Sequence, residues 1–439
     1  MRKVLVIAHA FPPIGGIGVQ RILKFTKYLP QFGWQPVILT VKHSDSFIRD
    51  ESLTEELPKT TLVYRTRSWE PFNATRVKQA TERIGGAASA NAGKSLKSQA
   101  VAVLRPLYFA LRIPDDKVGW WPFATRMGRK LMADEAIDLI FATAPPYTNF
   151  LVAQALKRAT GKPMVIDYRD EWSSMRYQDY PTNPVTDFLN RRLERSVLQS
   201  ANTVITATPG IGANLKQANL LAPTTALKNI FNGFDPDDYQ VEAPLPKEDR
   251  LTFVYTGTLY GERRTPKYFV QALAKLFQAK PELRTKIRVH LVGTIYEKHA
   301  QLIPEYGVED VVHLAGVVSH QQAIAYQLAA DVLLLIVGNG PGSEAVLTGK
   351  LFEYFGAGRP ILALAPLDGP AAKLIQETAT GEILDSEDVD GICRTVDQLY
   401  QAWVAGKLCY QPNQALLDQF SRPALTAQLA QLFDQLTGK

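Results

Sequence analysis

Short apolar runs alternate along this chain with longer amphipathic stretches. In the first half, apolar runs predict buried strands near residues 4–8, 36–41, 62–65, 139–142, 164–167 and 203–207, and amphipathic stretches predict helices near 124–133 and 185–199. The second half repeats the pattern, with strands near 252–255, 287–292, 311–314, 332–336 and 361–364 and helices near 268–278, 321–330, 388–405 and 422–436. This alternation indicates an α/β architecture with parallel, doubly wound sheets.

Two domains are expected, because a chain of 439 residues is too long for one hydrophobic core. A Pro- and Asp-rich link at 232–250 separates a Rossmann-like domain over 1–231 from a second one over 251–415. We expect the last segment, 416–439, to include a helix that packs back on the first domain. The two domains would face a central cleft, where ligands bind beside the carboxyl ends of the strands.

The stretch at 332–364 predicts an anion site. An apolar strand runs into a glycine-rich loop, and the loop runs into a short helix that Gly358 and Pro360 end. The free N–H groups and the dipole of a helix N-terminus favour phosphate, and Thr348 can cap this helix. Lys350 places a positive charge in the first turn, where the dipole disfavours one, so a bound anion is expected to offset that cost.

The composition argues against several classes of protein. The two cysteines, Cys393 and Cys409, form no CxxC motif, so neither a disulfide framework nor a zinc site is expected, and a reducing cytosol fits. The apolar run at the start is short and is followed by no small-residue cleavage site, unlike a signal peptide. No run of about 18 apolar residues occurs, so no membrane-spanning helix is expected.

The positive charge is concentrated in one segment. The whole chain carries a net charge of +6, whereas residues 76–130 carry +8 from eleven basic and three acidic side chains. This basic insertion, near 74–130, predicts contact with an anionic surface or substrate. Its apolar stretch at 101–113, with Trp120 and Trp121, suits an element that lies in a membrane interface. The alternative is that these apolar side chains pack inside the first domain beside a solvated basic loop.

A second glycine-rich loop follows the first predicted strand. Its residues Gly15 and Gly16 are not spaced as in GxGxxG, and the next strand ends without an Asp or Glu to hold a ribose. A nicotinamide dinucleotide is therefore not expected here, and the simplest role of the glycines is a tight turn from strand to helix. We expect His9, at the end of the first strand, to pack or to form hydrogen bonds rather than to act as a base.

Five sequence fragments follow one another along the chain in an informative order. They are FPPIGGIGVQR (11–21), ATAPPYT with VIDYRDEW (142–148 and 165–172), NGFD (232–235), TGTLYGERRTP (256–266) and GKLFEYFGAGRPIL (349–362). Together they resemble the GT-B glycosyltransferases, specifically a bacterial subgroup of the retaining family-4-like group. The resemblance covers nearly the whole chain and implies a nucleotide-sugar domain in the second half and an acceptor-side domain in the first.

The resemblance also implies a donor site. Arg263 or Arg264 would contact the diphosphate with Lys350, since a forked guanidinium suits phosphate oxygens, and Glu353 would bind the ribose. The remaining donor-binding residues would be Gly15, Gly16, Gly257, Ser343, Glu344 and Leu351. The family commonly carries two glutamates with seven residues between them, but Glu344 lies one position too early. Either Glu344 positions the donor sugar after a loop adjustment, or the backbone of residues 340–343 does.

On the acceptor side, the resemblance places Tyr147, Arg169 and Asp170 near the sugar or the acceptor. Adjacent residues at a strand end alternate faces, so an ion pair within DYRDEW can account for one aspartate and the arginine. We expect Asp170 to be the residue that reaches the ligand.

We therefore expect a glycosyltransferase that moves a sugar from a nucleotide diphosphate to an acceptor hydroxyl, with retention implied by the resemblance. Arg263 or Arg264, Lys350 and Asp170 are its expected catalytic residues. Neither a metal nor a cofactor is expected, because no Asp-x-Asp cluster lies in a suitable loop of the second half. The expected partners are a nucleotide sugar and a saccharide or lipid-linked acceptor, not a nucleic acid.

Such an enzyme would take part in bacterial polysaccharide or glycolipid assembly, in the cytoplasm or peripherally on the inner face of the membrane. Two alternatives remain open, a nucleotide-sugar epimerase on the same fold and a non-catalytic subunit that binds sugar nucleotides.

Overall fold

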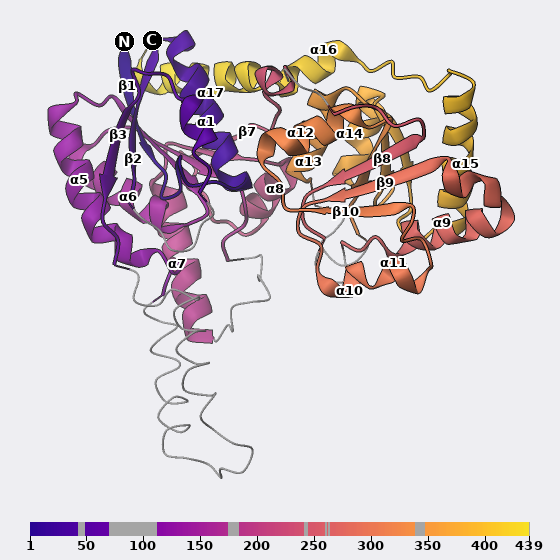
Figure 1. The fold of residues 1–439 in the computed structure, drawn as a ribbon. Helices are drawn as coiled ribbons and strands as arrows, with labels where there is room; N and C mark the ends of the chain where they lie inside the picture. Colours follow the sequence, from indigo (N-terminus) through magenta and orange to yellow (C-terminus); the bar gives the residue numbers. More distant parts are fainter. Residues whose placement is uncertain are drawn as a thin grey trace, which may run out of the picture. The chain divides into compact units, whose positions relative to one another are not determined.

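The computed structural model describes residues 1–42, 49–69, 112–173, 184–240, 245–259, 261, 264–338 and 347–438. They form two compact units, one of Met1–Phe231 with Thr426–Lys439 and one of Asn232–Leu425. Each unit is built on one parallel sheet (Figure 1). The predicted pair of α/β, Rossmann-like domains is confirmed.

The N-terminal unit has a sheet in the order β3-β2-β1-β4-β5-β6-β7. Its strands are β1 (Arg2–Ile7), β2 (Trp34–Val41), β3 (Leu62–Thr66), β4 (Leu139–Ala144), β5 (Met164–Tyr168), β6 (Thr203–Thr206) and β7 (Ala226–Asn229). The strand order changes direction at β1 and β4, so right-handed crossovers place helices on both faces. The central strands are buried on both faces, which explains their nearly continuous apolar sequence.

The helices of this unit lie between the strands in the sequence. They are α1 (Ile17–Tyr28), α2 (Ser52–Glu55), α5 (Trp121–Asp134), α6 (Thr148–Thr160), α7 (Pro184–Ser200) and α8 (Pro209–Gln217), with short 3-10 turns η1 (Leu29–Phe32) and η2 (Val118–Trp120).

The helix α17 (Arg422–Thr437) ends in the N-terminal unit although it follows the whole C-terminal unit. The ring of Phe433 lies edge-on to Trp34, with 5.2 Å between the ring centroids, and also contacts Phe141. Asp434 accepts a hydrogen bond of 2.8 Å from Trp34 Nε1 and forms an ion pair with Arg2. The first two strands therefore share their core with a segment about four hundred residues further along the chain.

The C-terminal unit has a sheet in the order β10-β9-β8-β11-β12-β13. Its strands are β8 (Leu251–Thr256), β9 (Ile287–Val292), β10 (Val312–Gly316), β11 (Val332–Ile336), β12 (Ile361–Leu364) and β13 (Gly381–Leu384). Its helices are α9 (Lys267–Ala279), α10 (Glu297–Ala300), α11 (Leu302–Glu305), α12 (His320–Ala329), α13 (Gly349–Ala357), α14 (Pro370–Thr378), α15 (Val389–Val404) and α16 (Gln414–Leu417), with 3-10 turns η3 (Pro236–Tyr239), η4 (Pro281–Thr285) and η6 (Asp418–Phe420).

The segment that enters this unit lies against the segment that leaves it. The N–H of Phe234 donates to the carbonyl of Phe420 at 3.1 Å, and the N–H of Arg422 donates to the carbonyl of Phe234 at 2.7 Å. A Cβ on Gly233 would lie 2.1 Å from the Phe420 oxygen, so the close approach needs glycine. The predicted link at 232–250 thus begins as a paired, ordered segment.

The predicted membrane element is wrong at Trp120. This side chain is fully buried in the N-terminal core, its ring lies edge-on to His9, and its Nε1 donates to Thr66 Oγ1 at 2.7 Å. Lys117 is also buried, whereas Trp121 is 41% exposed. Burial of Trp120 against the sheet agrees with the alternative of core packing. The preceding part of the basic insertion, residues 70–111, lies outside the described residues.

Candidate active site

Glycines end three neighbouring strands at the carboxyl edge of the C-terminal sheet. Gly257 follows β8 and Gly293 follows β9, each with φ near +123°, and Gly316 ends β10 with φ +71°. The N–H of Gly257 donates to Val292 and the N–H of Gly293 donates to Gly316, both at 2.7 Å. A Cβ on Gly293 would lie 2.1 Å from the Gly257 oxygen. The edge is therefore bare backbone, which leaves room for groups that reach it from elsewhere.

The side chain of Lys350 occupies the space above Gly257. A Cβ on Gly257 would lie 1.9 Å from Lys350 Cε and 2.5 Å from its Nζ. Lys350 belongs to the first turn of α13, where Thr348 Oγ1 accepts a hydrogen bond from its backbone N–H. The missing Cβ thus lets the lysine cross from α13 to the end of β8.

The charge of Lys350 is only weakly compensated. The residue is 8% exposed, and among the described residues no acidic side chain lies within ion-pair distance of its Nζ. Burial, followed by the nearby Arg264, lowers the pKa of Lys350 to about 8, while Glu353 opposes this change. The Nζ also lies 5.5 Å from the centroid of the Tyr255 ring. A buried cation in a helix N-terminal turn is an arrangement that an anion would stabilise.

Tyr354 fastens α13 to the sheet. Its hydroxyl accepts a hydrogen bond from the N–H of Thr256 at 3.0 Å and donates to the carbonyl of Leu334 at 3.2 Å. Because Tyr354 is fully buried, its hydroxyl has a raised pKa and stays protonated. These bonds fix the helix that carries Lys350 against the end of β8 and the middle of β11.

Glu353 is half-buried one turn after Lys350. Gln327 of α12 donates from Nε2 to Thr256 Oγ1 at 3.0 Å and makes a long contact of 3.5 Å with the Glu353 carboxylate. The backbone carbonyl of Glu353 accepts a hydrogen bond of 2.6 Å from the hydroxyl of Tyr239. The carboxylate therefore keeps acceptor capacity for further hydroxyl donors.

The loop after β8 is held by a histidine that the sequence analysis did not identify. His299 is buried, its Nε2 lies 3.0 Å from the carbonyl of Gly261, and its Nδ1 lies 3.3 Å from Thr265 Oγ1. These contacts flank Arg264, which is half-buried and close enough to Lys350 to lower its pKa. The sequence gives no local signal for this contact, because Gly261 lies 38 positions from His299.

The remaining predicted donor residues divide into two groups. Leu351 is fully buried, so its side chain contributes packing rather than a ligand contact. The predicted residues Arg263, Ser343 and Glu344 lie outside the described residues.

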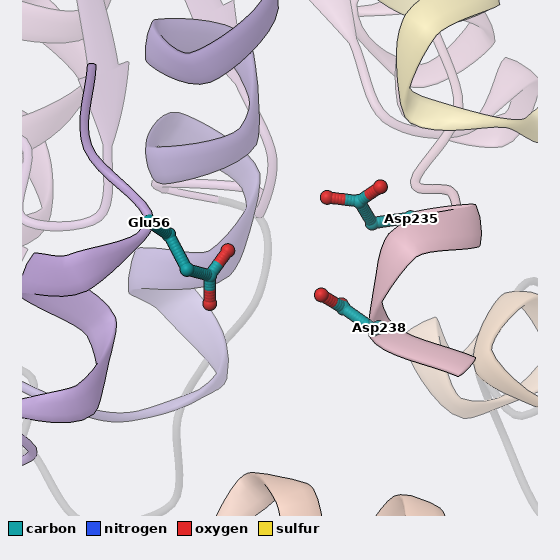
Figure 2. Close-up of side chains that lie close together, drawn as sticks. All are labelled: Glu56, Asp235 and Asp238. Atoms are coloured by element: carbon teal, nitrogen blue, oxygen red, sulfur yellow. The ribbon is translucent and has the colours of Figure 1, made fainter. Parts of the chain in front are cut away.

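Two aspartates of the link form a turn (Figure 2). Asp235 caps η3 and accepts from the N–H of Asp237 at 3.2 Å, and Asp238 lies 3.5 Å from His320 Nε2. The third labelled side chain, Glu56, belongs to the N-terminal unit, where it pairs with Lys24 at 2.5 Å. The Asp-rich link thus supplies a cap for η3 and a carboxylate close to the His320 ring inside the C-terminal unit.

The ion pair expected within the DYRDEW motif is wrong, because Asp167 pairs with Arg21 from outside the motif. Asp167 is fully buried and accepts two-pronged hydrogen bonds from Arg21 of α1, with Nη2 at 2.9 Å, and one from Thr143 at 2.7 Å. Arg21 also donates to the carbonyls of Ile230 and Phe231. The pair therefore ties α1 to β5 and to the end of the unit.

The guanidinium group of Arg169 forms hydrogen bonds with backbone carbonyls. Its three guanidinium nitrogens donate to the carbonyls of Ala144 at 3.1 Å, Gly18 at 2.5 Å and Pro145 at 2.9 Å. Arg169 thereby holds the loop after β4 against the start of α1. There, Gly16 at φ +114° is the N-cap of α1 and Gly15 is buried.

Among the acidic side chains of this motif, Asp170 accepts the fewest hydrogen bonds from described residues, so its carboxylate is the one most able to bind a ligand. Burial raises its pKa, while Arg169 opposes this change, and no hydrogen bond to its carboxylate is found among the described residues. The hydroxyl of Tyr147 donates to the carbonyls of Asp170 and Glu171, at 3.2 and 2.8 Å, and the Tyr147 ring stacks on Trp172. Tyr147 therefore positions the segment that carries Asp170.

Two family models match the chain. The model described as glycosyl transferase 4-like domain matches residues 15–227, and the model described as glycosyl transferases group 1 matches residues 250–402. They cover both units in the expected order. The chain belongs to the GT-B glycosyltransferases.

Solved structures have the same fold as this glycosyltransferase at low sequence identity. A glycosyltransferase from Rickettsia africae has a TM-score of 0.63 and 12% identity over 100% of this chain and 99% of its own. Sucrose-phosphate synthase from Thermosynechococcus elongatus has a TM-score of 0.63 and 16% identity over 99% of both chains. Anabaena HepE, in a complex with UDP and glucose, has a TM-score of 0.61 and 15% identity over 99% of this chain and 100% of its own.

No protein of curated function matches the sequence of this glycosyltransferase. Among its described residues, no helix is both long enough and apolar enough to cross a membrane.

Proposed function

We propose that this glycosyltransferase moves a sugar from a nucleoside diphosphate to an acceptor hydroxyl, with retention at the anomeric carbon. The observation that carries the proposal is the buried Lys350 ammonium, which lies on Gly257 without an acidic partner among the described residues. The complexes of HepE with UDP and with UDP-glucose support a nucleotide-sugar donor. The acceptor would be a saccharide or lipid-linked saccharide of bacterial polysaccharide or glycolipid assembly, at the cytoplasmic side of a membrane.

The step that needs help is cleavage of the bond between the anomeric carbon and the diphosphate oxygen. The electron pair leaves with the diphosphate, and the acceptor oxygen bonds to the sugar and loses its proton. Lys350, Arg264 or Arg263, and the N–H groups of α13 would stabilise the charge on the leaving diphosphate. Asp170, with its raised pKa, would contact the acceptor or the sugar.

Nucleotide binding tests the donor site directly. UDP, GDP and ADP sugars are added to the protein in thermal-shift experiments, where a ligand at about 100 times its Kd stabilises by roughly 2.7 kcal/mol. We expect one nucleotide class to raise the Tm and Lys350→Ala to remove most of that rise. The matched control is Lys373→Ala, which removes the same charge from an exposed position in α14. An equal Tm rise in both variants would exclude the assignment of Lys350.

The transfer is proposed to need no metal, since basic groups and a helix N-terminus would stabilise the leaving group. Activity should then survive excess EDTA. Loss with chelator and recovery with magnesium or manganese would exclude catalysis by these groups alone. Product analysis separates the alternatives: an epimerase forms an epimer without acceptor, a transferase releases nucleotide only with acceptor, and a binding subunit does neither.

A further inference from the structure

A basic groove with exposed apolar residues lies on the N-terminal unit, outside the site described above. It has a volume of about 900 Å³ and lies between α7 and α8. Leu215, Leu220 and Ala218 form its apolar side, and Arg191, Arg192 and Arg195 line it from α7. The volume is that of an ordinary ligand or headgroup pocket.

The described residues of the unit do not neutralise the arginines of this groove. All three are exposed, and no ion pair or hydrogen bond to them is found among the described residues. Glu194, between them in the sequence, is buried and turns inward to Tyr168 and Ser173. The groove therefore presents three free guanidinium groups to solvent, which suits phosphate.

The preceding turn of α7 exposes large apolar side chains. Val185 is 66% exposed, Phe188 is 63% exposed and Leu189 is 36% exposed. These positions follow one another at helical spacing on the face that continues to Arg192. An apolar end followed by arginines is the pattern of a helix that lies in a membrane interface, where the apolar residues enter and the guanidinium groups reach phosphates.

The sheet topology shows at which edge of the sheet the apolar end of α7 lies. β5 and β6 are adjacent parallel strands, so the connecting α7 begins at the edge where the strands end and runs back. Its apolar end thus lies at the same edge as Asp170, and Figure 1 shows α7 extending past this edge.

We infer that α7 docks the protein on an anionic bilayer, with Val185, Phe188 and Leu189 in the interface and the three arginines on lipid phosphates. A neutral lipid surface would leave the arginines uncompensated, and a soluble anion would leave the apolar residues in water. Docking itself does not depend on the proposed function. That it serves a lipid-linked acceptor rests on the proposed function.

The test is sedimentation of the full chain with vesicles of phosphatidylcholine, alone or mixed with phosphatidylglycerol. We expect binding only to the anionic vesicles, and weaker binding as salt rises. Each basic residue near an anionic surface is worth about fivefold in binding, so Arg191→Glu, Arg192→Glu and Arg195→Glu together should lower it by at least roughly a hundredfold. The matched control makes the same charge change on exposed residues of α5, Arg126→Glu, Arg129→Glu and Lys130→Glu, and should bind far better.

A second pair of variants tests how much the apolar side chains contribute to vesicle binding. Phe188→Ser should weaken vesicle binding roughly tenfold, whereas Val404→Ser, at an exposed position in α15, should leave it unchanged. All four variants change exposed side chains, so their Tm and the Tm rise with UDP should match those of the unchanged protein if UDP is its nucleotide.

Several results would overturn the inference. They are absence of binding to anionic vesicles, equal loss in the α5 and α7 charge variants, and unchanged binding in the α7 variants. If Phe188→Ser changes the molecular mass in solution and not vesicle binding, the face is a protein interface instead. Vesicle binding without any nucleotide effect on the Tm would leave the docking standing and count against the proposed function.

Discussion

The ammonium of Lys350 lies where burial and the nearby Arg264 disfavour its charge. Its pKa of about 8 lies below the value of about 10.4 expected in the unfolded chain. The unfolded state therefore binds more protons between these values, and the free energy of unfolding should rise with pH across this window. Below pH 8 the full cost of the buried charge is present.

The first prediction is that Lys350→Met stabilises the ligand-free protein. A pKa lowered from 10.5 to about 8 corresponds to a cost of up to about 3 kcal/mol at pH 7, since each pKa unit is worth about 1.4 kcal/mol. Urea unfolding of both proteins at pH 7 and pH 9.5 measures the difference. The gain should shrink at the higher pH, and a gain independent of pH would mean that methionine simply packs better.

The second prediction concerns Gly257. Gly257→Ala places a Cβ 1.9 Å from Lys350 Cε at a φ of +123°, so the lysine must leave its position. Nucleotide binding should fall at least tenfold, and stability should fall by about 1–3 kcal/mol because of backbone strain. Gly406→Ala is the control, because Gly406 also has a positive φ but has nothing within 4 Å of the added carbon. Calorimetric titration and urea unfolding should show strain without loss of nucleotide binding in that variant.

At the scale of the elements, the sequence predicts most of the strands, including the edge strands β3 and β10, and misses the opposite edge strand of each sheet. β9, β11 and β12 have their predicted bounds. β11 and β12 are continuously apolar because they are buried on both faces, whereas β9 alternates buried apolar residues with the half-buried Arg288 and His290. β7 and β13 were not predicted: each has four residues and partly exposed faces, so its apolar signal is weak. Helix α14, at the same end of the sheet as β13, was also missed.

The sequence predicts the candidate site only where the residues of the site lie close together in the chain. The first turn of α13, with Lys350 and Glu353, can be read from one stretch of sequence. The contact of Lys350 with Gly257 and the pairing of Arg21 with Asp167 cannot, because both join residues that are distant in the chain and close only after the sheets form.

The third prediction concerns that second contact. Asp167→Asn leaves the Arg21 guanidinium buried without its counter-charge, which typically costs about 3–5 kcal/mol. The control is Asp397→Asn, which breaks the partly exposed pair with Lys280 and should cost under about 1 kcal/mol. Urea unfolding reports both, and similar losses in the two variants would contradict a structural role for the buried pair.

At the scale of the whole molecule, the family and the two α/β units follow from the order of the motifs. The helix α17 makes this arrangement more than two domains in series, because the chain returns from the C-terminal unit to complete the N-terminal one. The stability of the N-terminal unit should therefore depend on residues encoded at the other end of the sequence.

The fourth prediction tests this dependence. Phe433→Ala removes a fully buried ring from between Trp34 and Phe141, a change that costs about 3–5 kcal/mol in protein cores. Tryptophan fluorescence should show the region of Trp34 unfolding at lower urea. Exposed Phe188→Ser, at the surface of the same unit, should not shift that transition. An unchanged midpoint in Phe433→Ala would mean that α17 only rests on the surface.

Because α17 belongs to the N-terminal unit, that unit can be completed only after the end of the chain has been translated. Asp434 is translated 400 positions after Trp34, the residue whose indole it binds. At roughly 5–20 residues per second, the ribosome needs on the order of 20–80 s to cover that distance. During this time the C-terminal unit can emerge and fold, while the indole of Trp34 and the ring of Phe141 still lack their contacts with Phe433. The nascent protein therefore exposes an aromatic surface on the unit that is made first and finished last, where a chaperone would be expected to bind.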